Sequence, residues 1–119
     1  MDVEAFRDYC LAKKGVTEEL PFGPDTLVFK VGGKIFALCG LDNVPFSVNL
    51  KCDPDRAIML REEYPDHIRG AYHMNKKHWN SLEPEFLPQH LVTELVDHSY
   101  SLVVLGLPKK LQQEITKNF

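Results

Sequence analysis

The segment from Thr26 to Cys52 constrains the fold more than any other, because it has the pattern of three antiparallel strands joined by two turns. Its first part, TLVFKV, alternates with the two-residue period of a strand. The glycine pair at 32–33 follows, and two glycines readily adopt the positive backbone dihedral angles of a tight hairpin. A second turn at 40–43 then leads into a third alternating stretch, FSVNLK. The segment therefore predicts a small meander of strands.

A two-residue turn at this glycine pair also predicts how the first two strands pair. Phe29 is expected to lie across from Phe36, and Leu27 across from Leu38, so that all four form one apolar face. The opposite, outward face of the meander is then expected to carry Val28, Lys30, Ile35, Ala37 and Cys39. That face is more apolar than phosphate binding requires, which favours a protein partner or self-association.

The rest of the chain supplies helices on either side of this meander. Asp2 and Asp53-Pro54 are helix start signals, and Gly15, Pro65 and Gly106 end helices. We expect helices near residues 3–14, 54–63, 88–105 and 109–119, and further strands near 16–20, 68–73 and 78–82. This order, α-β(3–4)-α-β(2)-α, predicts an α+β two-layer sandwich, with an antiparallel sheet and helices mainly on one face. No linker or repeat divides the chain, so residues 1–119 are expected to form a single domain.

Composition limits the class of protein. At 119 residues, 44% hydrophobic and 26% charged, the chain is typical of a globular domain, and it has no apolar run that could span a membrane. Its first ten residues carry acids where a signal peptide carries bases. Three cysteines without a CxxC pair indicate reduced thiols. We therefore expect a cytoplasmic protein with no membrane association.

The charges are unevenly distributed along the sequence. The net charge is −3, yet residues 26–52 carry +2 and residues 67–82 carry +3, which leaves −8 for the remainder. The expected strands are thus basic and the expected helices acidic, so one positive surface on an acidic protein is possible.

The sequence nominates no catalytic residue, metal site or cofactor. Phosphate-cradling GxxxxGK[ST] loops and GxSxG nucleophile turns are absent. The five histidines do not follow a recognised ligand spacing. Cys52 precedes a helix start, where a thiol pKa can fall, but a small buried hydrophobic residue is the commoner role for such a cysteine. A pocket lined by His73, His78 and Tyr100 would be needed for a small-molecule enzyme or sensor.

The stretch from Arg69 to Trp79, RGAYHMNKKHW, is the best functional candidate. Its cations suit phosphates, and the rings of Tyr72 and Trp79 can stack on unpaired bases. A structural explanation competes with this one and is the commoner of the two. In it, Trp79 belongs to the core and the pair at 76–77 forms a solvated turn.

Several motifs extend over nearly the whole chain: GVTEELPFGPDTLVFKVGGKIFAL at 15–38, SVNLKCDPDRA at 47–57, HMNKKHW at 73–79 and DHSYSLVVLGLPKK at 97–110. In this combination the sequence resembles the MmcQ/YjbR family. The resemblance implies a fold like that of CyaY and the secretion chaperones, in a small bacterial cytoplasmic protein with no accepted enzymatic reaction. The positions that match the family motif are Asn75, Lys76, His78, Trp79, Ser99 and Tyr100.

The resemblance also implies a function, because hairpins of this family are described as a double wing proposed to contact DNA. We therefore expect a non-enzymatic protein that binds DNA through two basic hairpins. The residues expected to contact nucleic acid are Lys30, Lys34, Arg69, Lys76, Lys77, His78 and Trp79. The alternative is a protein-interaction or chaperone-like module that uses the open face of the sheet.

Overall fold

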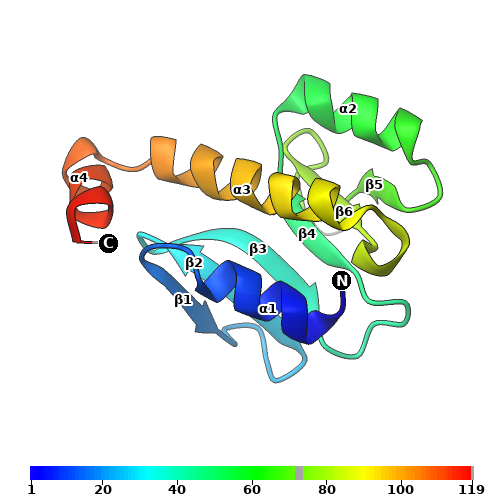
Figure 1. Cartoon of the computed structure of the whole chain (residues 1–119), viewed down its shortest axis with the longest axis horizontal. Coiled ribbons are helices and arrows are strands. Elements are labelled where there is room, and N and C mark those ends of the chain that lie inside the picture. Colours follow the sequence, from blue (N-terminus) through cyan, green and yellow to red (C-terminus); the bar gives the residue numbers. More distant parts are fainter. Residues whose placement is uncertain (72–73, 119) are drawn as a thin grey trace.

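The computed structural model describes residues 1–71 and 74–118, and it contains an antiparallel sheet with helices packed against it (Figure 1). The strands are β1 (Val16–Glu19), β2 (Thr26–Val31), β3 (Lys34–Gly40), β4 (Val48–Lys51), β5 (Ile68–Gly70) and β6 (Trp79–Leu82). The helices are α1 (Val3–Leu11), α2 (Pro54–Glu63), α3 (Gln89–Leu105) and α4 (Lys109–Asn118), with a 3-10 turn at Pro84–Phe86. The strands are ordered β1-β2-β3-β4-β6-β5 in space, and every neighbouring pair is antiparallel. The expected α+β sandwich is confirmed.

The helix start signals act as the sequence predicts. The Asp2 carboxylate accepts a hydrogen bond from the Ala5 N–H at 2.9 Å, which caps α1. Asp53 caps α2 in the same way through the Arg56 N–H at 3.2 Å, with Pro54 at the first helical position. Within the described ranges, no helix combines the length and the apolar content that a membrane span requires.

The core lies between one face of the sheet and the helices α1, α2 and α3. Phe6 of α1 is fully buried and makes edge-to-face contacts with Phe29 at 6.0 Å and with Phe46 at 5.9 Å between ring centroids. The central helix α3 lies across β3 and β4 and buries Val92, Leu95, Val96 and Val103 against them. The sheet face and the buried stripe of each helix therefore share one core.

A β-bulge changes the pairing of the first hairpin. Lys30 pairs with Ile35 as a tight turn requires, but Phe29 pairs with Ala37, so Phe36 is an extra residue in β3. The predicted Phe29–Phe36 pair is therefore wrong. Both Phe36 and Ala37 are fully buried on the helix side, which the regular alternation of a strand would not allow.

The bulge also reverses the faces of the residues that follow it. Leu27 pairs with Cys39 and not with Leu38, because a shift of one residue turns every later side chain to the other face. Ala37 and Cys39 belong to the core, so the prediction that they face outward is wrong. Leu38, expected in the core, pairs with Val28 on the face that α1, α2 and α3 leave uncovered.

On the helix-free face, Leu38 takes the place of Ala37 and Cys39, and polar side chains of the neighbouring strands lie beside it. The strand register places Thr17, Glu19, Val28, Lys30, Ile35, Leu38, Asn49, Lys51, Arg69, Trp79 and Ser81 on it. The hydroxyl of Ser81 donates a hydrogen bond to the Asn49 side chain near the centre of this face. The face is therefore a mixture of basic, polar and apolar side chains.

Substitution of Phe6 by alanine should lower the free energy of unfolding by about 3–5 kcal/mol, because it leaves a cavity beside the rings of Phe29 and Phe46. Chemical denaturation followed by circular dichroism measures this change. Phe22 is 68% exposed, and Phe22→Ala is the matched control, expected to change stability by about 0.5 kcal/mol or less. Equal losses from the two substitutions would contradict this description of the core.

His98 connects α3 to the start of α2. Its Nε2 accepts a hydrogen bond from the Asp53 N–H at 3.1 Å, which requires that this nitrogen carry no proton. Burial and, secondarily, the nearby Arg56 lower the pKa of His98 below its ordinary value of 6.5. The neutral imidazole is therefore part of the folded structure.

Stability should consequently fall as the pH drops below about 6.5, because His98 then binds a proton in the unfolded chain before it does so in the folded one. Urea unfolding at about pH 7.5 and 5.5 should show a loss that is smaller in His98→Gln, whose amide oxygen can still accept the hydrogen bond. His90→Gln, at an exposed position of the same helix, is the control. Equal effects of the two substitutions on the pH dependence would rule out this role for His98.

Candidate functional site

The candidate site lies where β3 and β4 separate. Their pairing runs from Cys39–Val48 to Ala37–Leu50 and then stops. In a regular ladder the Lys51 N–H would next donate to the Phe36 carbonyl. Instead, the Lys51 N–H donates to the Ser99 hydroxyl at 2.9 Å, and that hydroxyl donates to the Phe36 carbonyl at 2.5 Å. Ser99 of α3 thus stands between the two strands and satisfies both backbone groups.

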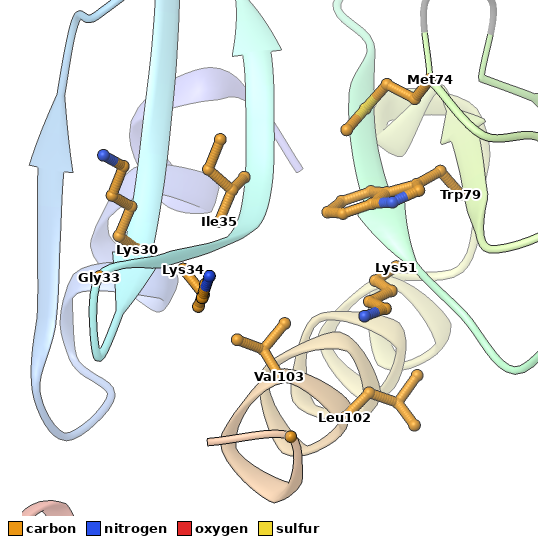
Figure 2. Close-up of a pocket in the computed structure, with 10 residues that line it drawn as sticks. Lys30, Gly33, Lys34, Ile35, Lys51, Met74, Trp79, Leu102 and Val103 are labelled. Carbon is orange, nitrogen blue, oxygen red and sulfur yellow. The ribbon is translucent and has the colours of Figure 1, made fainter. Parts of the chain in front are cut away.

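A groove of about 560 Å³ opens beside this bridge. We call it the strand-split groove, and its lining residues are Lys30, Gly33, Lys34, Ile35, Lys51, Met74, Trp79, Leu102, Val103 and Gly106. Figure 2 shows the β2–β3 hairpin on one side of it, Met74 and Trp79 on the other, and Leu102 and Val103 of α3 beneath the opening. Its volume is in the range of about 300–1,000 Å³ that is usual for small-molecule sites.

The electrostatics of the strand-split groove are basic, since its lining within residues 1–71 and 74–118 contains three lysines and no acidic residue. The Lys30 ammonium lies 3.4 Å from the Glu19 carboxylate. Lys34 and Lys51 make no salt bridge within residues 1–71 and 74–118. The carboxyl end of α3 reaches the groove at Gly106, where its partial negative charge attracts ammonium groups and opposes an anion placed directly beside it. The arrangement suits an anion held at the rim by Lys34 and Lys51.

Trp79 is held in place by its backbone. Its N–H donates to the Asn75 carbonyl at 2.9 Å, and its carbonyl accepts from the Ala71 N–H at 3.1 Å. Met74 beside it contacts the Asn49 side-chain amide through its sulfur at 3.6 Å. The indole is therefore presented to the groove from a fixed strand, as a flat, half-buried wall.

Three of the residues expected to contact nucleic acid come together in this groove. Lys30, Lys34 and Trp79 line it, although Trp79 is far from both lysines in the sequence. Arg69 lies on the same helix-free face but on the edge strand β5. The expected residues Lys76, Lys77 and His78 belong to the loop before β6 and do not line the groove.

This loop has a structural organisation of its own. The side chain of Asn75 accepts from the Lys77 N–H at 2.9 Å, and its carbonyl accepts from the His78 N–H at 3.0 Å. The Lys76 carbonyl accepts a hydrogen bond from Arg61 of α2, and its stem lies against Gly70. The Lys76 side chain therefore packs over β5 and does not line the groove.

The third expected arrangement, a pocket formed by His73, His78 and Tyr100, does not describe this groove. His73, like Tyr72, lies outside the described residues. Tyr100 packs edge-on against Phe36 at 5.5 Å and donates its hydroxyl to the Lys14 carbonyl at 2.6 Å, while burial raises the pKa of its phenol. Tyr100 thus joins α3 to β3 and to the turn that follows α1.

Comparisons with known proteins decide the family. The family model described as YjbR matches residues 11–102, which is more than half of the chain. This chain belongs to the YjbR family. It is 47% identical over 97 residues to the uncharacterised protein YbdF of Escherichia coli O157:H7, covering 80% of this chain and 78% of that one. It is 32% identical over 112 residues to the uncharacterised protein YjbR of Escherichia coli K12, covering 92% and 93% of the two chains.

Solved structures show the same fold. The Deinococcus radiodurans protein DR2400, with a domain of the DUF419 family, superimposes with a TM-score of 0.90 at 36% identity, over 96% of this chain and 87% of that one. A protein from Pseudomonas syringae superimposes with a TM-score of 0.74 at 27% identity, over 86% and 98%. The two Escherichia coli relatives are named as uncharacterised, so membership of the YjbR family brings no assigned activity.

Sequence reasoning missed several residues of the strand-split groove in this YjbR-family protein. Lys51 is not among the expected site residues, although the alternation of FSVNLK places it on the face opposite to apolar Leu50. Met74 and the α3 residues Leu102 and Val103 carried no comparable signal. Their presence depends on how the loop and the helix pack against the sheet.

The three cysteines are buried thiols, as expected for Cys52. Burial raises the pKa of Cys52, and the same cause raises the pKa of Cys39 to about 11 and that of Cys10 further. Across residues 1–71 and 74–118, three or more His, Cys, Asp or Glu side chains do not gather as metal ligands would.

Removing the Ser99 hydroxyl should destabilise the fold, because Ser99→Ala leaves the buried Lys51 N–H and Phe36 carbonyl without their shared partner. The expected loss in free energy of unfolding is about 1–3 kcal/mol. Ser101 is exposed on the same helix, so Ser101→Ala controls for the change in helix propensity. Indistinguishable denaturation curves for the two variants would mean that the bridge contributes nothing.

Proposed function

We propose that this YjbR-family protein binds nucleic acid, with the strand-split groove at the centre of the contact. The observation that carries this proposal is the convergence of three lysines from β2, β3 and β4 around one aromatic wall, with no acid in the lining. Phosphate groups attract such a cluster strongly at low salt, even on a protein whose net charge is −3.

The helix-free face supports an extended contact. Arg69 shares this face with Lys30 and Lys51, and Asn49 and Ser81 lie on it as uncharged hydrogen-bonding groups. A sheet face of this kind can follow a sugar–phosphate backbone without burying an unpaired charge. Lys77 is exposed in the neighbouring loop and extends the contact along the second hairpin, together with Lys76 at its margin.

A protein partner on the sheet face is less well supported. That alternative depended on an apolar outward surface that included Ala37 and Cys39, and both residues lie in the core. In β3 the outward positions belong to Ile35 and Leu38, and the neighbouring strand β4 adds Asn49 and Lys51, which suit a charged and hydrated ligand better than an apolar one.

The proposal is tested by measuring how salt changes binding to fluorescently labelled DNA. Fluorescence anisotropy from about 50 to 200 mM salt should show affinity that falls steeply as salt rises. The double variant Lys34→Ala, Lys51→Ala should bind all sequences more weakly and reduce the slope of log affinity against log salt by about 2, one for each lost phosphate contact.

The matched control is Lys109→Ala, Lys110→Ala, which removes the same charge from exposed positions of α4. This variant should keep most of the affinity and most of the salt slope. The proposal fails if the wild-type protein shows no salt-sensitive binding at low ionic strength. It also fails if the control weakens binding as much as the groove variant does.

A further inference from the structure

We propose that the strand-split groove holds one unpaired nucleobase of a single strand, stacked on Trp79, with the adjoining phosphate at Lys34 and Lys51. This inference rests on the nucleic-acid binding proposed above and goes further, because it specifies which form of nucleic acid the protein prefers. Binding of phosphates alone would need only surface lysines and would favour no particular form.

The walls of the groove are suited to a flat, apolar ring. Trp79 forms one side, Ile35 lies on the opposite side, and Leu102 and Val103 form the floor (Figure 2). Stacking of a base on an aromatic side chain contributes about 1–3 kcal/mol and tolerates any base, because every base has a π face. A phosphate without a ring would leave these apolar walls uncovered.

The groove also provides cations where the rest of a nucleotide would lie. Lys34 and Lys51 come from the two strands that Ser99 separates, so their stems enter from opposite sides of the opening. A base that entered between them would carry its phosphate at the rim, within reach of both ammonium groups. Lys30 lies on the hairpin side, where the Glu19 carboxylate, 3.4 Å from its ammonium, offsets part of its charge.

The position of Trp79 distinguishes single strands from duplexes. The half-buried indole forms a wall between the β2–β3 hairpin and α3, so a base must leave its own stack to lie flat against it. Bases of an intact duplex remain stacked on their neighbours and cannot enter such an opening without unpairing. An unpaired base is therefore the form that can stack on Trp79.

The groove is organised before any ligand arrives. The backbone of Trp79 is hydrogen-bonded on both sides, and the Cys52 N–H donates to the His78 carbonyl at 2.8 Å just beyond it. Ser99 is fully buried and holds the two strands at the opening. Such preorganisation reduces the entropy lost on binding.

The experiment uses the intrinsic fluorescence of Trp79, the only tryptophan in the sequence. The protein is titrated with a single-stranded oligonucleotide of about 12 nucleotides, a typical length for one such site. Three further ligands are an abasic strand of the same length, the matching duplex, and free deoxyadenosine monophosphate. The expected result is quenching by the base-containing strand and at least tenfold weaker binding of the other three.

Variants of Trp79 provide the second measurement, by anisotropy of a labelled strand. Trp79→Ala should lower the affinity for the base-containing strand by about 5- to 150-fold, which corresponds to the loss of one stacked base. The same variant should bind the abasic strand as the wild type does. Trp79→Phe keeps a smaller aromatic ring and should retain part of the preference, and denaturation curves confirm that each variant is folded.

Each outcome has a distinct meaning. If the abasic strand binds as tightly as the base-containing strand and Trp79 is not quenched, the base site is wrong while nucleic-acid binding stands. If none of the ligands binds, both proposals fail. If free deoxyadenosine monophosphate binds as tightly as the strand does, the groove recognises a single nucleotide and not a base within a strand. That result overturns this inference.

Discussion

The Ser99 hydroxyl is the interaction on which the centre of this structure depends. It accepts from Lys51 and donates to Phe36, so a single side chain of α3 completes a ladder that two strands leave unfinished. Direct pairing would have kept β3 and β4 together and covered the helix behind them. With the hydroxyl between them, the strands stay connected through α3, and the apolar residues of that helix become the floor of a groove.

The bulge at Phe36 acts together with this bridge. The extra residue keeps both Phe36 and Ala37 in the core, and it turns Leu38 to the helix-free face. Phe36 also provides the carbonyl that Ser99 contacts and the ring that Tyr100 packs against. One inserted residue therefore determines which side chains cover the core and where the ladder ends.

The candidate site was only partly accessible to prediction from the sequence. Lys30, Lys34 and Trp79 were found because cations and aromatic rings suit nucleic acid wherever they lie. Their convergence was not predictable, since it depends on which strands become neighbours in the sheet. Ser99 was noted as a motif position, but its role as a bridge required coordinates.

The sequence by itself determined the elements and their order, because strand alternation, glycine turns and helix caps act over a few neighbouring residues. It also determined the excess of positive charge in the strand segments. Only the tertiary structure decided which face those charges occupy and where the sheet opens. A one-residue bulge and a single hydroxyl leave no periodic signal in the chain, yet a shift of one residue reverses the faces of a strand.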